Sequence, residues 1–217
     1  AVASGSLSDG SIVVLNADGT VSVVGGAAGT SASFGTPTSV GVDTASYLSA
    51  VFDSNSNKVV IAYRDVDNSD YGTAIVGTVS GTSISFGTAV VYNSSATYNS
   101  GVTFDSNSNK IVIAFYDASN SNYGTAIVGT VSGTSISFGT AVVYNNAATF
   151  RTSLTFDSNL NKVIIAYRDD GNSSYGTAIV GTVSGTSISF GTPVVFESAF
   201  TDATSAIFDT NTNKVVI

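Results

Sequence analysis

The stretch YGTAIVGTVSGTSISFGT occurs unchanged at residues 71–88, 123–140 and 175–192, so its copies begin 52 residues apart. The phrase Phe-Asp-Ser/Thr-Asn recurs with the same spacing, starting at Phe52, Phe104, Phe156 and Phe208. A fixed period of this length indicates structural units that stack on their neighbours. The chain is therefore expected to be a repeat protein, and one repeat should explain most of the fold.

One repeat contains four segments typical of β-strands, at 47–52, 58–64, 72–79 and 84–92. They are rich in Val, Ile, Thr, Tyr and Phe, and turn residues bound them. The turn DSNSNK between the first two carries Asp and Asn, which bond their own backbone. Nothing in the repeat indicates a helix. We refer to these segments as strands one to four of a repeat.

Strands two and three are apolar on both alternating faces, which predicts a sheet packed between two neighbouring sheets. Gly77, Gly129 and Gly181 lie in the middle of strand three. A glycine in a strand interior often marks a close approach of backbone. We expect an adjacent sheet to come close at these three positions.

Four antiparallel strands per repeat of about 50 residues are typical of a β-propeller blade. The predicted fold class is all-β, a β-propeller of four-stranded antiparallel blades, with a β-solenoid or a stack of sheets as the alternative. The predicted units are an N-terminal hairpin and partial blade (1–41), three blades (42–92, 93–144 and 145–196) and a partial blade (197–217).

The two ends each carry part of a repeat. The N-terminal part holds a hairpin, SIVVLNADGTVSVV at 11–24, and then a strand-four equivalent at 31–41, where SASFGT matches SISFGT of the later copies. The C-terminal part holds strand one at about 202–208 and the start of strand two at 214–217. These parts would close a four-bladed ring if they paired, but a longer natural chain is the favoured expectation.

Composition excludes several functions. The chain of 217 residues has 7 Lys and Arg against 15 Asp and Glu, a net charge of −8, with no Cys and no His. An acidic chain is poorly suited to nucleic acid or anionic lipid. No apolar run approaches the roughly 20 residues that span a bilayer. We expect no nucleic-acid partner, no membrane insertion, no cofactor and no metal.

The copies differ in only some connections. The one–two turn is nearly constant and the three–four turn, SGTS, is identical in the complete repeats. The two–three loops (65–70, 117–122 and 169–174) vary, and the four–one connections (93–100, 145–152 and 197–204) vary most. In a propeller these two connections share one face. Loops often drift without consequence, but the turns of the opposite face have not drifted, so selection for varied chemistry is favoured.

The variable face is therefore the predicted binding surface. Aromatic rings next to amide, carboxylate and guanidinium groups suit the recognition of a sugar or a protein. The predicted ligand-binding residues are Arg64, Asp67, Asp70, Tyr98, Asn99, Tyr116, Phe150, Arg151, Arg168, Asp169, Glu197 and Asp202.

Catalysis has little support. No His exists to activate a serine. Glu197 is the single Glu, and the repeated Asp53, Asp105, Asp157 and Asp209 are interpreted as turn-formers. Arg64, Arg151 and Arg168 number as many as the arginines with which sialidases hold a carboxylate, but the Asp-box turn of that family is missing, so solvated surface arginines are favoured. We expect no enzyme.

A calcium loop at 65–70 is disfavoured as well. Asp65, Asp67, Ser69 and Asp70 place oxygen atoms there, as hard cations prefer. The sister loops, however, lose most of these acids.

The phrase NKVVIAYRD…YGTAIVGTVSGTSISFGT resembles repeat segments of virion-associated proteins from marine bacteriophages, and of proteins from marine bacteria. The opening LSDGSIVVLNADGTVSVVGG is similar to the hairpin that precedes repeat regions in phage virion proteins. This resemblance implies a setting, the virion or the extracellular space, and no catalytic residues.

The expected function is that of a phage tail fibre or appendage that binds a host surface glycan or protein and contacts other virion subunits. Alternatives are a capsid or tail decoration protein, a bacterial surface adhesin and, as a minor one, a glycan hydrolase. Homo-oligomerisation is left open.

Overall fold

The computed structural model of the protein describes residues 13–15, 21–23 and 35–217. The chain divides into two units, Ala1–Thr36 and Pro37–Ile217. In the first unit, β1 (Val13–Leu15) pairs antiparallel with β2 (Val21–Val23), which confirms the predicted hairpin strands. Of the strand predicted at 31–41, residues 31–34 lie outside the described part, and residues 35–41 form no strand.

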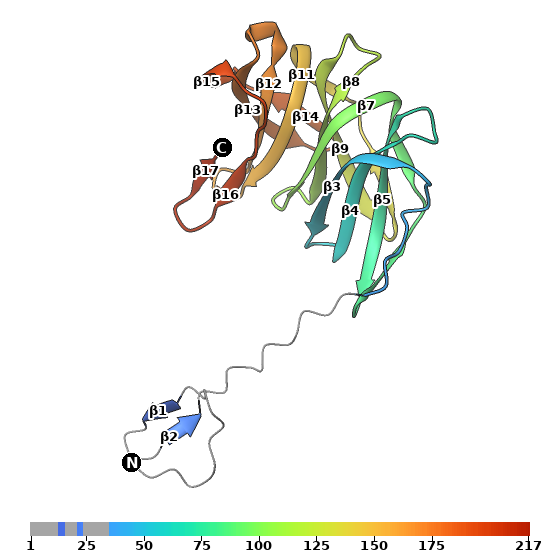
Figure 1. The fold of residues 1–217 in the computed structure, drawn as a ribbon, viewed down its shortest axis with the longest axis vertical. Helices are drawn as coiled ribbons and strands as arrows, with labels where there is room; N and C mark the ends of the chain where they lie inside the picture. The colour runs from blue at the N-terminus through green and yellow to red at the C-terminus, as the bar shows by residue number, and fades with distance from the viewer. Residues whose placement is uncertain (1–12, 16–20, 24–34) are drawn as a thin grey trace. The chain divides into compact units, whose positions relative to one another are not determined.

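The second unit consists of strands (Figure 1). In chain order they are β3 (Ala45–Asp53), β4 (Lys58–Asp65), β5 (Tyr71–Ser80), β6 (Ser83–Phe86), β7 (Val90–Asp105), β8 (Lys110–Asp117), β9 (Tyr123–Ser132), β10 (Ser135–Phe138), β11 (Val142–Asp157), β12 (Lys162–Asp169), β13 (Tyr175–Ser184), β14 (Ser187–Phe190), β15 (Val194–Phe200), β16 (Ile207–Asp209) and β17 (Lys214–Val216). Strands β3 to β15 form one antiparallel sheet of 13 strands that is not closed, and β16 pairs with β17 separately.

These elements confirm the all-β class. Across the described residues the one helical element is a short 3-10 turn, η1 (Asp170–Asn172), in a segment predicted to be a loop. The described part of the chain therefore holds no helix long and apolar enough to cross a membrane. The C-terminal strand one is shorter than the predicted 202–208, because β16 begins only at Ile207.

Two long strands join neighbouring repeats. The first half of β7 pairs with β5 and its second half with β8, and β11 pairs with β9 and β12 in the same way. Each repeat therefore forms a four-stranded part of this sheet, in which the fourth place is shared by two strands that lie end to end beside strand three, such as β6 and the start of β7 beside β5. We call these the first sheet (β3 to β6 and the start of β7), the second sheet (the end of β7 to the start of β11) and the third sheet (the end of β11 to β15).

The connections 93–100 and 145–152 were predicted to be loops, and that prediction is wrong. Both are strand throughout, inside β7 and β11. Register breaks interrupt the pairing of these strands on either side of the crossing. Because a β-bulge bends a strand sharply, the chain passes from one sheet to the next without leaving its hydrogen-bond ladder. The unit boundaries predicted at 92/93 and 144/145 fall inside these strands.

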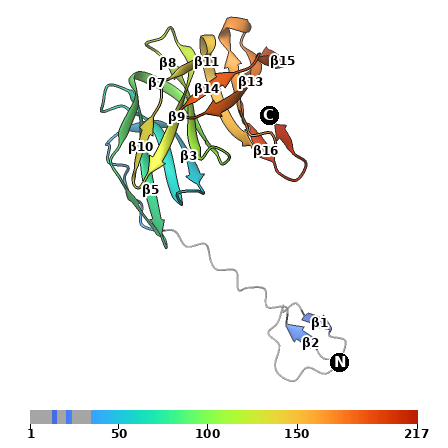
Figure 2. The ribbon, with the colours of Figure 1, turned by 180° about the vertical axis from the view of Figure 1, so that it is seen from behind.

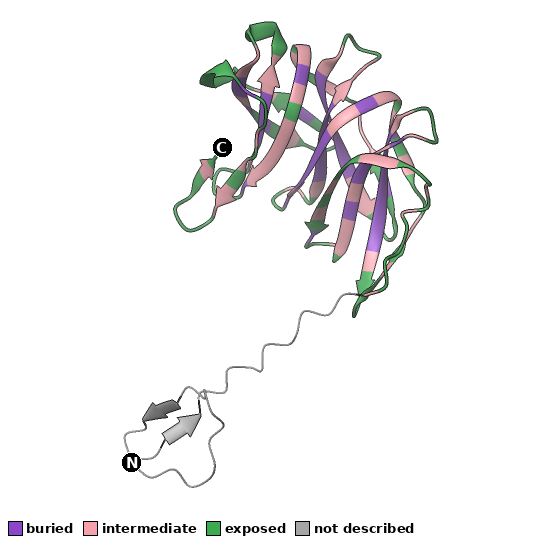
Figure 3. Ribbon diagram, viewed as in Figure 1, coloured by how far each residue is buried: buried purple, intermediate pink, exposed green. Residues whose placement is uncertain are grey.

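Apolar faces hold the three sheets together. Val60, Ala62 and Val76 of the first sheet pack in one core with Ile111 and Phe115 of the second. A second core repeats this contact one sheet further along the chain. Its residues include Val112, Ala114 and Val128 of the second sheet and Val163, Ile165 and Tyr167 of the third. The second sheet is thus covered on both faces, as its apolar strands predicted; buried residues are purple in Figure 3.

The first strands of successive sheets lie side by side. β3 lies next to the second half of β7, which lies next to the second half of β11. The backbone amide of Val102 donates to the hydroxyl of Ser49 across the first of these contacts, at 3.2 Å. At the outer side, β10 lies beside β5 and β14 beside β9 (Figure 2). Successive sheets therefore meet along both their first and their last strands.

The predicted close approach of an adjacent sheet at Gly77, Gly129 and Gly181 is wrong. A Cβ atom at Gly77 would meet the side chains of Ile84 and Phe86, at 2.7 and 3.1 Å, which belong to the same sheet. The neighbouring sheet instead comes close at Gly87 and Gly139 of the FGT phrase. A Cβ atom at either position would overlap a backbone carbonyl in the three–four turn of the next sheet.

The one–two turns are built as predicted. The Asp53 carboxylate accepts hydrogen bonds from the backbone amides of Asn55 and Ser56, at 2.9 and 3.0 Å. The later copies repeat this arrangement at Asp105, Asp157 and Asp209. These carboxylates are thus occupied by turn amides at the end of the sheets opposite the variable connections.

Candidate ligand-binding pocket

A pocket of about 450 Å³ opens where the variable connections of the three sheets meet. Six of the predicted binding residues line it together. The lining consists of Tyr47, Tyr98, Asn99, Tyr116, Ala118, Phe150, Arg151 and Arg168. All three sheets contribute, so the pocket depends on how successive sheets pack.

A bulge in strand one of each sheet directs side chains into this pocket. The strand pairing shifts register after Ser46, Tyr98 and Phe150. In each bulge one residue adopts a left-handed backbone conformation, with φ of 53° at Tyr47, 52° at Asn99 and 55° at Arg151. Bulges re-aim side chains, and residues other than glycine pay about 1–3 kcal/mol for this conformation. The three strained residues are equivalent in the repeat, and all three line the pocket.

This strain gives a stability prediction. Arg151→Gly should unfold at higher denaturant concentration than Arg151→Ala, with a free energy of unfolding about 1 kcal/mol larger. Both variants remove the guanidinium, but only glycine accepts the φ of 55° without strain. Urea unfolding followed by circular dichroism measures the difference. Equal midpoints for the two variants would show that the bulge is unstrained.

A row of aromatic rings forms one wall of the pocket. Tyr47 and Tyr98 meet edge to face with ring centroids 5.7 Å apart, and Tyr98 meets Tyr116 in the same way at 5.3 Å. Tyr116 and Phe150 are tilted, at 5.2 Å. Burial, and next the charge of Tyr98, raise the pKa of Tyr116 above its ordinary value, so this phenol stays protonated at neutral pH. The row crosses from the first sheet to the third.

Two arginines hold this row in place. Arg64 lies over Tyr98 at 4.5 Å and forms an ion pair with Asp70 at 2.6 Å. In the third sheet, Arg168 lies over Phe150 at 4.7 Å and over Phe200 at 5.2 Å. Its partner is Asp170, at 2.7 Å. Stacked and paired guanidiniums of this kind stabilise their surroundings.

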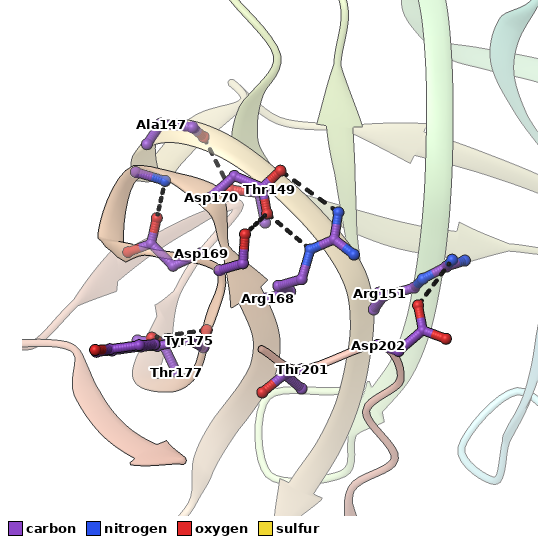
Figure 4. A network of polar contacts seen from close by, with 12 residues as sticks. Ala147, Thr149, Arg151, Arg168, Asp169, Asp170, Tyr175, Thr177, Thr201 and Asp202 are labelled. Carbon is purple, nitrogen blue, oxygen red and sulfur yellow. Dashed lines mark hydrogen bonds and ion pairs between the residues drawn. The ribbon is translucent and has the colours of Figure 1, made fainter. Parts of the chain in front are cut away.

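The interpretation of the arginines as solvated surface residues is therefore wrong for two of the three. The side chains of Arg64 and Arg168 are only 19% and 13% exposed. Arg151 differs, because its side chain is 48% exposed and its contact with Asp202 is long, at 3.4 Å. Figure 4 shows Arg168 tied to Asp170, with Arg151 reaching toward Asp202. Arg64 does not line the pocket with the other two.

The remaining predicted residues do not line this pocket. Asp67 accepts hydrogen bonds from the backbone amides of Asp43 and Thr44, both at 2.8 Å. The Asp169 carboxylate accepts from the Asn145 amide and from the Gly171 backbone, both at 3.0 Å. Asp67 and Asp169 thus fix the loops that surround the pocket.

Glu197 and Asp202 instead line a second pocket of about 490 Å³ near the C-terminus, together with Phe196, Phe200 and Ile217. Asp202 is 76% exposed.

A half-buried carboxylate, that of Asp117, anchors the rim between the first and second sheets. Burial acts to raise the pKa of Asp117, but hydrogen bonds from Ser95, Ser119 and Asn93 outweigh it and hold the pKa below its ordinary value. Ser95 donates at 2.7 Å and the Ser119 hydroxyl at 2.8 Å. Asp117 is therefore ionised at neutral pH and ties a two–three loop to the adjacent four–one connection.

The chemistry of the pocket suits binding. Within the described residues, no acidic side chain lines it, and no three His, Cys, Asp or Glu come together as metal ligands do. Its groups are aromatic rings, an amide and two guanidiniums, which offer stacking surfaces and hydrogen-bond donors.

Sequence reasoning missed Tyr47, Ala118 and the ring of Phe200. Tyr47 lies in the predicted strand one, outside the variable connections, although it is the repeat equivalent of Asn99 and Arg151. Comparing equivalent positions across the bulge would have identified it.

A constant residue inside the variable connection was missed too. Thr97, Thr149 and Thr201 are buried, and each hydroxyl donates to the carbonyl two residues before it.

A scan against protein-family models found no match to this chain, and a search of curated proteins found no match either.

Proposed function

We propose that the protein is a non-enzymatic recognition module that binds a host surface glycan or protein through the pocket at its variable face. The observation that carries this proposal is the convergence of residues that differ among the copies. Tyr98, Tyr116 and Phe150 stand at positions whose residue differs among the copies, and they line one pocket. The turns at the other end of the sheets keep their sequence almost unchanged. A repeated scaffold with one varied end is the arrangement expected of a binding protein.

We also propose that the three sheets are blades of a β-propeller. Two observations support this arrangement over a stack or a solenoid. Successive interfaces use positions 52 residues apart, such as Val60 and Val112, so each sheet is related to the next by a similar rotation. The first strands of successive sheets lie side by side, as strands around a central axis do.

The proposed setting is a bacteriophage virion, as a tail fibre or similar appendage outside the cell that also contacts other virion subunits. The sequence resemblance to virion-associated repeat proteins supports it. The low charged content and the lack of Cys suit such a setting equally.

The binding proposal is tested with Tyr116→Ala. The purified protein is screened on a glycan array and against whole cells of marine bacteria, and the affinity for the best hit is then measured for each variant. An aromatic contact contributes about 0.5–1.5 kcal/mol beyond the area that it buries, so we expect Tyr116→Ala to weaken binding about tenfold.

Leu160→Ala is the matched control. Leu160 is 64% exposed and lies in a one–two turn at the opposite end of the sheets. Its removal should leave the affinity unchanged. Equal losses for the two variants, or no binding to any glycan or cell, would refute the proposed function.

A further inference from the structure

We infer that the pocket selects an acidic saccharide, with Arg151 binding the carboxylate or sulfate of the ligand. This inference rests on the proposed function and names the ligand class of the same site. It follows from the charged residues of the lining, the contacts and exposure of each arginine and the chemical groups of the aromatic wall.

The lining is cationic although the chain is acidic. The protein has a net charge of −8, yet the described residues that line the pocket include Arg151 and Arg168 and no acid. Arg168 is neutralised by Asp170, but the exposed guanidinium of Arg151, with its long contact to Asp202, can attract an anion. An anionic group is therefore the best match for this pocket.

Only one of the two guanidiniums is placed to bind a ligand. Arg168 lies between two rings and donates to both oxygens of Asp170, at 2.7 and 3.4 Å. Arg151 contacts Asp202 at 3.4 Å, with side chains 48% and 76% exposed. An exposed ion pair of this kind contributes little. A ligand carboxylate or sulfate can replace Asp202 and gain two parallel hydrogen bonds from the guanidinium fork.

The wall next to Arg151 suits a sugar ring better than a peptide. Tyr98, Tyr116 and Phe150 offer ring surfaces, the two tyrosines add hydroxyl groups, and Asn99 adds an amide at the lining. These groups complement the C–H face and the hydroxyl rim of a saccharide. A peptide that adds a strand needs an uninterrupted edge. Strand one is broken by the bulge at this point, so it offers no continuous edge.

The test measures the affinity of the whole chain for four probes by isothermal titration calorimetry. They are an alginate trisaccharide carrying carboxylates, a κ-carrageenan tetrasaccharide carrying sulfates, neutral laminaritriose and a short poly-glutamate peptide. We expect at least one acidic saccharide to bind at least tenfold more tightly than laminaritriose or the peptide. Its affinity should fall as salt rises from 50 to 500 mM, because salt screens exposed charge pairs.

Arg151→Ala should lower the affinity for the acidic probe about tenfold or more, and it should remove most of the salt dependence of that affinity. Lys214→Ala is the control, since it changes the net charge equally at an exposed site outside the pocket lining. The carboxylate and sulfate arms show which anion is preferred.

Several results would overturn the inference. Laminaritriose binding as tightly as the acidic probes, with Tyr116→Ala abolishing it, would refute the acidic ligand and leave the proposed function standing. Poly-glutamate binding as tightly would indicate a protein ligand instead. An affinity that Arg151→Ala leaves unchanged would refute the role of Arg151. Failure of every probe, together with an empty glycan array and no cell binding, would remove the proposed function as well.

Discussion

Gly139→Ala is expected to lower the free energy of unfolding by about 3 kcal/mol or more, which is the upper range for overpacking a well-packed contact. A Cβ atom at this position would overlap the backbone carbonyl oxygen of Thr186, in the three–four turn of the third sheet. Since backbone cannot step aside as a flexible side chain can, the second and third sheets would have to separate locally. Urea unfolding followed by far-UV circular dichroism measures the loss.

Gly191→Ala provides the matched control. Gly191 is the repeat equivalent of Gly139, in the same FGT phrase. The nearest atom to its added Cβ would be the carbonyl oxygen of Val180, at an ordinary 3.8 Å. We expect a change within about 0.5 kcal/mol. A Gly139→Ala variant as stable as Gly191→Ala would mean that the sheets do not pack as closely as described.

Tyr144→Ala is expected to lower the free energy of unfolding by about 3–5 kcal/mol, the range for removing a buried aromatic side chain. Tyr144 is 6% exposed, and its ring lies against Tyr167 and Phe190, with centroids 5.2 and 5.8 Å away. Its hydroxyl also shares a hydrogen bond of 3.2 Å with Thr152. Removing the ring leaves a cavity between the second and third sheets. The free energy of unfolding from urea titration reports the cost.

Phe196→Ala should lower the free energy of unfolding far less, by about 1 kcal/mol. Phe196 is the repeat equivalent of Tyr144 but is 43% exposed. Its ring also covers a glycine, Gly176, so the local environment within its own sheet is the same. The difference between the two variants thus isolates the contribution of the following sheet. Similar costs would show that stability arises within each sheet and not between sheets.

The repeat made most of the fold predictable. The one–two turn could be predicted because Asp53 and its equivalents bond amides two and three residues away, which is a local interaction. Strands two and three could be predicted because their apolar pattern reflects burial on two faces. The continuity of β7 could not, since it depends on pairing with two different partners, β5 and β8. Local sequence does not encode that pairing.

The candidate site was predictable in part, for a similar reason. Differences between copies indicated Tyr98, Phe150 and Arg151. The left-handed backbone conformation of Tyr47 could not be predicted from the sequence, because tyrosine has no preference for this conformation and the bulge imposes it. The roles of the arginines depend on loop geometry too. Arg64 pairs with the last residue of its loop, Asp70, whereas Arg168 pairs with Asp170 near the start of its own.

The identical strand-three segments have a consequence for how such a protein changes over generations. The variable connections at 93–100, 117–122, 145–152 and 169–174 each stand between two copies of YGTAIVGTVSGTSISFGT. A genetic crossover within that shared segment would add, remove or exchange a whole connection in one event. The new neighbours would still present the apolar faces and the FGT glycine that fit one another, because both core interfaces use equivalent positions. Recombination could thus assemble a new set of pocket residues without disturbing the packing that supports it.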